Sequence, residues 1–223
     1  MTNVVFFHGE KGGVGKSTAL MWMADYLLLN GDADKLGIIE ADNVRDIKQR
    51  FEKTGKVVES PLEVEDDDSR LGGMLRVFET AVEMAENGIE TIFVNLPGRA
   101  SVRLDPNAEL LKESMEESGL KMSVVFVADA DEHSRTLFDE SMRAGLLSVA
   151  DETILIFNQR HGRTPETWPV AQATATPDHI AKMPVVDASV WEVVKTVAAP
   201  MSTLATDKQL NVMKRNVLKR WIR

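Results

Sequence analysis

The feature that most constrains this chain is a glycine-rich loop between a short apolar segment and a helix. Residues 3–8 enclose the run Val-Val-Phe-Phe, and residues 17–30 repeat apolar side chains at helical spacing. Between them lies the stretch His8-Gly9-Glu10-Lys11-Gly12-Gly13-Val14-Gly15-Lys16-Ser17-Thr18. The order of strand, glycine-rich loop and helix is that of a phosphate-binding loop.

The residue types in this loop suit the binding of a nucleoside triphosphate. Glycines let successive backbone N–H groups turn inward, and the following helix adds the positive end of its dipole. We expect the Lys16 charge to meet the β- and γ-phosphates and the Ser17 hydroxyl to ligate Mg²⁺. The alternative, a tight turn that binds nothing, is disfavoured because Lys-Ser directly follows the last glycine. The residues expected around the phosphates are Gly12, Gly13, Val14, Gly15, Lys16, Ser17 and Thr18.

The rest of the chain continues to alternate strand and helix patterns. Strands are expected at 36–40, 91–95, 123–128 and 153–157, and helices at 44–53, 74–87, 108–118, 132–148, 189–197 and 207–223. Such alternation predicts an α/β fold, a mostly parallel, doubly wound sheet with helices on both faces. Because we find no repeat and no long linker, residues 1–223 are expected to form a single P-loop domain.

Composition excludes several other classes of protein. The chain has no cysteine and only four histidines, which argues against disulfides, thiol catalysis and zinc sites. Its apolar runs are too short to span a membrane and its N-terminus does not resemble a signal peptide, so we expect a cytoplasmic protein. The acidic run at 63–68 is most simply a solvated loop. The net charge is -9, yet the last twenty residues are basic, so a basic tail follows an acidic body.

The loop carries a second lysine, Lys11, ahead of its glycines. In the form K-G-G-x-G-K-S-T it resembles the deviant Walker A motif of the ParA/MinD family of ATPases. The resemblance implies ATP and Mg²⁺ as cofactors and an ATP-dependent homodimer. It also implies catalytic roles for Lys16 and for Lys11, which would reach the phosphates of the partner subunit. The simpler interpretation is a lysine that solvates the rim of the loop.

Two later segments resemble the switch regions of the same family. In Glu40-Ala41-Asp42, Asp42 matches the acid that orients the attacking water and contributes to the metal site, while Glu40 replaces the first aspartate. Asp42 could also cap the next helix. Asn95 stands where the family has an acid that holds Mg²⁺ through water; an amide can accept that hydrogen bond but adds no charge. We therefore expect nucleotide binding, with hydrolysis weakened or dependent on Glu40 and Asp42.

Weaker similarities complete the family assignment. Asn158, after the strand at 153–157, matches an asparagine that contacts adenine, although asparagine is also an ordinary turn former. Residues 183–187 resemble a segment that flanks the base. The short length and the terminal helix are most similar to small ParA-like proteins of plasmid conjugal transfer and stability, the TraL type.

The function implied is an ATP-binding and hydrolysing dimerisation switch in plasmid DNA partition, positioning or conjugal transfer, stimulated by a small partner protein. The alternatives are a nucleotide-binding adaptor with little or no hydrolysis, favoured by Asn95, and a P-loop kinase or synthetase, whose arginine-rich lid would have to come from 160–163.

The terminal helix suggests how the protein contacts its cargo. A helical wheel predicts an apolar face that packs on the domain and an opposite basic face that meets DNA of any sequence or an acidic partner. This pattern disfavours membrane binding. The apolar face consists of Leu210, Met213, Val217 and Trp221, and the basic face of Lys208, Arg215, Lys219 and Arg223.

Overall fold

A computed structural model describes residues 1–9, 12–30, 36–42, 46–53, 56–59, 71–129, 131–159 and 176–223. Within these residues a seven-stranded sheet has the order β3-β2-β4-β1-β5-β6-β7, and every neighbouring pair of strands is parallel. The strands are β1 (Thr2–His8), β2 (Leu36–Glu40), β3 (Lys56–Glu59), β4 (Thr91–Asn95), β5 (Leu120–Ala128), β6 (Glu152–Asn158) and β7 (His179–Met183). The expected parallel α/β sheet is confirmed.

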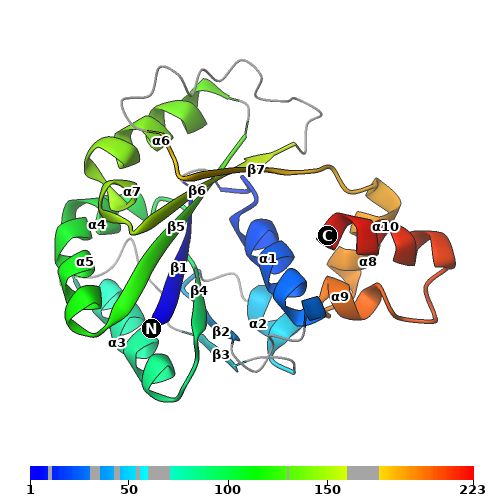
Figure 1. Ribbon diagram of the computed structural model, residues 1–223. Coiled ribbons are helices and arrows are strands. Elements are labelled where there is room, and N and C mark those ends of the chain that lie inside the picture. The colour runs from blue at the N-terminus through cyan, green and yellow to red at the C-terminus, as the bar shows by residue number, and fades with distance from the viewer. Residues whose placement is uncertain are drawn as a thin grey trace.

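Helices cover both faces of this sheet (Figure 1). One face carries α3 (Gly72–Glu86), α4 (Ser101–Leu104), the 3₁₀ turn η2 (Asp105–Asn107), α5 (Ala108–Glu117), α6 (Glu132–Ala144) and α7 (Leu146–Val149). The other carries α1 (Lys16–Asn30) and α2 (Asp46–Phe51), while α8 (Ala188–Thr196), α9 (Met201–Leu204) and α10 (Val212–Ile222) lie beside α1 rather than over the strands. The inner strands are almost wholly buried because each faces a hydrophobic cluster on both sides. None of the helices in the described segments is long and apolar enough to cross a bilayer.

The helix expected over 132–148 is interrupted. It divides at Gly145, whose backbone is extended, into α6 and α7. The cause is Asp105, whose carboxylate accepts a hydrogen bond from the N–H of Leu146 at 2.8 Å and starts a new helix there. A side chain at Gly145 would have no room, since its Cβ would lie 2.5 Å from the Asp105 carboxyl carbon.

Two predictions about the terminal helix, its first residue and the burial of its apolar face, differ from the structure. It begins at Val212 and not at 207, because the Asn211 side chain caps it by accepting from the N–H of Lys214 at 2.9 Å. Its buried residues are Leu218, Trp221 and Ile222. Of the predicted apolar face, Trp221 is buried and Leu210 and Val217 are partly buried, but Met213 is 78% exposed. The first turn of α10 therefore does not pack as predicted.

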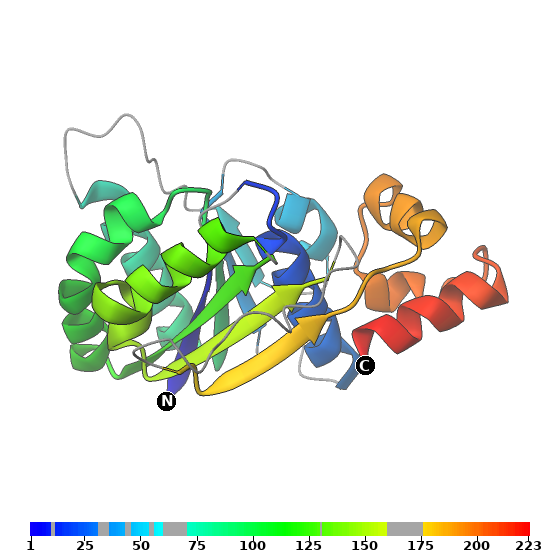
Figure 2. The same cartoon turned by 90° about the horizontal axis from the view of Figure 1, so that it is seen from above.

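The helices after β7 are attached to α1, beside which Figures 1 and 2 both place them. The buried carboxylate of Asp25 accepts from the backbone N–H groups of Met201 at 3.0 Å and Ser202 at 2.8 Å. Nearby, the Trp22 indole donates to the carbonyl oxygen of Trp221 at 2.7 Å. Because α1 starts at the glycine-rich loop, the same helix joins that loop to the C-terminal helices.

Candidate phosphate and metal site

The glycine-rich loop follows β1, the central strand, at the carboxyl edge of the sheet, where ligands of parallel sheets bind. Gly13 and Gly15 have φ angles of 75° and 107°, which favour glycine. At Gly15 space is also closed, because a Cβ would lie 2.4 Å from Nδ2 of Asn158. The loop then passes into α1, where the N–H of Ala19 donates to the carbonyl of Gly15 at 2.8 Å. In the described residues 12–18 the backbone therefore makes the turns that only glycine allows and leads directly into the N-terminus of α1.

Lys16 and His8 lie together beneath this loop. Lys16, the first residue of α1, is only 6% exposed. His8 is buried at the end of β1, and burial, followed by the Lys16 charge, lowers its pKa to about 3. The imidazole is therefore neutral at physiological pH, and Lys16 holds a positive charge next to the loop without a competing histidine cation.

The predicted metal residues Ser17 and Asn95 meet at this edge. The Ser17 hydroxyl lies 3.4 Å from Oδ1 of Asn95 and 3.3 Å from its Nδ2. On its other side, Nδ2 of Asn95 donates to Oε1 of Glu40 at 2.5 Å. Asp42, the third predicted metal residue, is half-buried two residues after Glu40. Hydroxyl, amide and carboxylate oxygens are ligands that Mg²⁺ prefers, so this donor set fits the ion.

Glu40 was expected to replace the first switch I aspartate and, with Asp42, to supply the charge that Asn95 lacks; the structure places its carboxylate directly against the Asn95 amide. Its second oxygen accepts from the N–H of Ile47 at 3.1 Å. Burial raises the pKa of Glu40 to about 7, with Asp42 adding to the rise and the Asn95 and Ile47 hydrogen bonds opposing it. Among the described side chains no group of three or more His, Cys, Asp or Glu could hold a metal. A cation here would thus depend on hydroxyl, amide and phosphate oxygens as well.

A pocket of about 400 Å³ adjoins the loop and is lined by Gly13, Gly15 and Thr18 on one side. Asn158, the predicted adenine contact, also lines it and donates from Nδ2 to the carbonyl oxygen of Val14 at 2.8 Å. Asn158 therefore supports the loop directly. The pocket is also lined by Met183, Pro184, Trp191 and Trp221. The segment at 183–187 was predicted to lie near the base, whereas the two tryptophans were not predicted to line the site.

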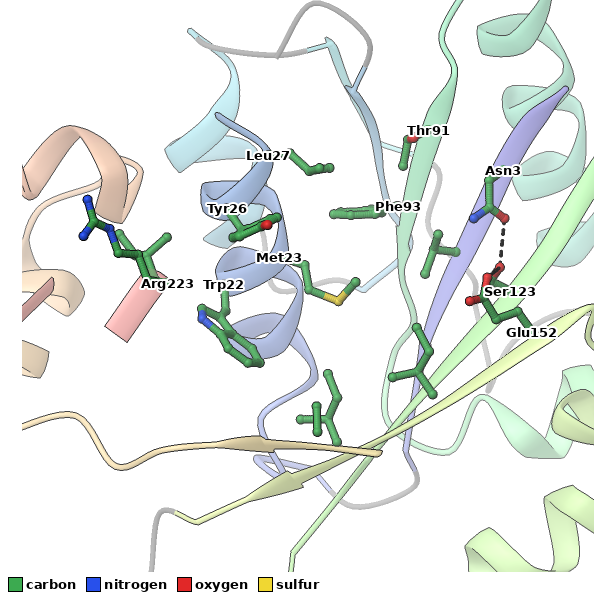
Figure 3. Close-up of a pocket in the computed structure, with 15 residues that line it drawn as sticks. Asn3, Trp22, Met23, Tyr26, Leu27, Thr91, Phe93, Ser123, Glu152 and Arg223 are labelled. Carbon is green, nitrogen blue, oxygen red and sulfur yellow. Dashed lines mark hydrogen bonds between the residues drawn. The ribbon is translucent and has the colours of Figure 1, made fainter. Parts of the chain in front are cut away.

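A second pocket, of about 460 Å³, lies between α1 and the sheet and contains none of the predicted phosphate, metal or base residues, although Arg223 of the predicted basic face lines it (Figure 3). Trp22, Met23 and Tyr26 line it from α1, while Phe93 lines it from β4. Its polar margin is already paired, since the Ser123 hydroxyl donates to Oδ1 of Asn3 at 2.9 Å. This pocket is mainly apolar and separate from the phosphate loop.

Three features of the sequence lie outside the described residues. They are the second lysine of the loop, Lys11, the acidic run at 63–68, and the arginine-containing stretch at 160–163.

Comparison with known proteins rests on structure. No protein-family model matches the sequence, and no curated protein matches it significantly. A proposed plasmid partition protein from Borrelia burgdorferi B31, bound to AMPPNP, has a TM-score of 0.59 at 16% identity over 100% of this chain and 97% of its own. The MinC:MinD cell division complex of Aquifex aeolicus gives a TM-score of 0.57 at 15% identity over 99% and 95% of the two chains.

The signal recognition particle receptor FtsY from Elizabethkingia anophelis has a TM-score of 0.54 at 14% identity, over 100% of this chain and 65% of that chain. All three comparisons span nearly the whole of this sequence. At these identities they establish the fold. The chain has a ParA/MinD-like fold.

Proposed function

We propose that this protein is an ATP-driven dimerisation switch that acts on DNA. The observation that carries the proposal is the phosphate loop at the carboxyl end of β1, with Lys16 buried beneath it and Ser17 beside Asn95. The fold shared with an AMPPNP-bound protein supports the same conclusion. Residues 12–18 would hold the phosphates, and the pocket of about 400 Å³ beside them would hold the base.

We assign Mg²⁺ to the Ser17 hydroxyl, with Asn95 and Asp42 acting through water. When bound, the ion neutralises charge on the β- and γ-phosphates. Asp42 would orient the attacking water, and Asn158 would keep the loop in shape while it borders the base. Lys11 would serve the phosphates of the partner subunit in an ATP-dependent homodimer.

The output of the switch would be plasmid partition, positioning or conjugal transfer in the cytoplasm, with a small protein partner that stimulates hydrolysis. Within the ParA-like proteins the TraL type is the subgroup we propose. The basic residues of the C-terminal segment would contact DNA of any sequence: Lys208, Lys219 and Arg223 are exposed and Arg215 is half-buried.

The decisive experiment measures ATP turnover with and without DNA, using Lys16→Ala as the inactive reference. We expect measurable turnover that DNA or a partner protein increases, and loss of AMPPNP binding in Lys16→Ala because the charge nearest the β/γ-phosphates is gone. Asn95 favours a second candidate, a binding module without hydrolysis. Tight AMPPNP binding without turnover under any of these conditions would select that module.

Dimerisation is tested separately by light scattering with ATP and Mg²⁺. Lys11→Ala should retain nucleotide binding as a monomer but fail to dimerise, because it removes a charge that the partner's phosphates need. If this variant dimerises as strongly as the wild type, Lys11 belongs to the rim of the loop.

A further inference from the structure

Glu40 and Asn95 occupy equivalent places on adjacent strands. Each is the last residue of its strand, and the register of the parallel pair β2–β4 sets them opposite one another. Both side chains are almost completely buried, at 1% exposure each. The acid on β2 and the amide on β4 therefore form one buried unit beside Ser17.

The hydrogen bonds of this unit fix the orientation of the amide. A carboxylate only accepts hydrogen bonds, so Oε1 of Glu40 requires the nitrogen side of the Asn95 amide, which it receives at 2.5 Å. The amide oxygen is consequently turned away from Glu40 and lies 3.4 Å from the Ser17 hydroxyl, which Nδ2 also approaches at 3.3 Å. Glu40 itself is held by the N–H of Ile47 at 3.1 Å. An unconstrained asparagine could present either its oxygen or its nitrogen to a cation.

We propose that Glu40 is a positioning residue of the magnesium site, which turns the oxygen of Asn95 toward the ion and supplies the negative charge that Asn95 lacks. The inference rests on the proposed function, in which Ser17 and Asn95 serve Mg²⁺. Acid and amide together would do what a single carboxylate on β4 could do alone. A divalent cation one side chain away would also compensate the cost of burying the Glu40 carboxylate.

If Glu40 served only as a cap for α2 through Ile47, Glu40→Gln would leave magnesium binding unchanged, whereas the positioning role predicts that magnesium binding weakens. In Glu40→Gln the new amide can still accept from Ile47 and can donate to Oδ1 of Asn95. Asn95 would then turn over and present its nitrogen toward Ser17 and the ion. The fold would keep its hydrogen bonds, but Mg²⁺ would meet a donor group at Asn95 and would lose the Glu40 charge.

The reciprocal exchange Glu40→Gln/Asn95→Asp offers a matched rescue. The new glutamine can accept from Ile47 and donate to the new carboxylate, so every hydrogen bond has a partner and the charge moves to β4. Glu59→Gln is the control, because Glu59 pairs with Glu40 in the β2–β3 register but contacts Lys48 at 3.2 Å. It removes a carboxylate from the same edge of the sheet, one strand further from Asn95.

The experiment measures the dissociation constant of AMPPNP by calorimetry, once in excess Mg²⁺ and once in EDTA. The constant in EDTA divided by the constant in Mg²⁺ is the magnesium-dependent gain in affinity. We expect Glu40→Gln to lose roughly 10- to 100-fold of this gain, as outer-shell changes at metal sites do, with little change in EDTA. The exchange variant should recover it, and Glu59→Gln should match the wild type. Thermal unfolding of each variant shows whether it is folded.

An undiminished gain in Glu40→Gln, or an exchange variant that does not recover it, would overturn the inference. If Glu40→Gln does not fold, the exchange variant alone decides: a wild-type gain supports the proposal and a lost gain refutes it. Failure of the wild type to bind AMPPNP would instead refute the proposed function. The two failures are thus distinguishable.

Discussion

His8 provides a sharp test of the electrostatics below the phosphate loop, through the substitution His8→Phe. The imidazole packs edge-on against Phe126, with ring centroids 5.4 Å apart and an interplanar angle of 85°, and a phenyl ring can keep that contact. Neither ring nitrogen of His8 has a hydrogen-bond partner within the described part of the chain. The substitution therefore removes two buried polar atoms and a titratable group while it preserves an aromatic ring.

The size of the pH effect on wild-type stability follows from the pKa of His8, which burial and then the Lys16 charge lower from 6.5 to about 3. Below pH 6.5 the unfolded chain binds a proton at this histidine and the folded protein does not, so wild-type stability falls as the pH falls. Each pH unit in this window costs about 1.4 kcal/mol, which gives about 2 kcal/mol between pH 7.5 and 5. At pH 7.5 the substitution should itself stabilise the fold by about 1–3 kcal/mol, because it removes buried polar atoms without partners.

The assay is urea denaturation of wild type and His8→Phe at several pH values. The difference in unfolding free energy between the two proteins should grow by about 2 kcal/mol from pH 7.5 to 5. Comparing the two proteins removes the contributions of other groups, including Glu40 and Asp25, whose raised pKa values act with the opposite sign. His133→Gln, on the exposed face of α6, is the control. A difference for His8→Phe that does not vary with pH would refute the reasoning.

Three further predictions concern the C-terminal helices. Asp25→Ala removes the acceptor of two buried N–H groups, which lowers the free energy of unfolding. Part of this loss is offset because a buried carboxylate, whose pKa burial raises to about 6, is removed as well. Urea denaturation at pH 7 should show a net decrease in unfolding free energy of about 2 kcal/mol. Trp221→Phe removes the indole N–H that donates to Pro184 at 2.8 Å and should cost about 1 kcal/mol in the same assay. A third variant replaces the four basic residues by glutamate: Lys208, Arg215, Lys219 and Arg223. It should lose salt-sensitive DNA binding in filter assays but keep AMPPNP binding. Wild-type protein that does not bind DNA but sediments with anionic vesicles would contradict the DNA assignment.

Local patterns were sufficient to predict the order of strand, glycine-rich loop and helix at the N-terminus and most of the other strands. The apolar run of β1, the glycine spacing and the helical period of α1 all lie within thirty residues, and each is a signal of short range. The short strand β3 and the strand β7 were missed. In β7 only Met183 of the five residues is buried, so the continuous apolar run that marks inner strands is absent there.

Long-range pairings explain what the sequence did not reveal in the site. Glu40 and Asn95 are 55 residues apart, and only the pairing of β2 with β4 brings them together. The contribution of Trp221 to the pocket beside the loop likewise depends on how α10 packs. The start of that helix and the burial of Met213 were mispredicted because a wheel assumes one continuous helix against one surface, while the observed helix starts at the Asn211 cap and only its second half is buried.

The packing of α1 connects the phosphate loop to the basic segment that we propose to bind DNA. Its first residue, Lys16, lies beneath the loop, while Trp22 and Asp25 hold α10 and α9. Trp221 of α10 in turn reaches the pocket beside the loop and donates to the carbonyl of Pro184 in its wall. The basic segment is therefore attached to the nucleotide site by two routes, through α1 and through the residue after β7. A nucleotide in this pocket would therefore contact Trp221, the residue of α10 whose indole and carbonyl hold the element that carries the basic residues.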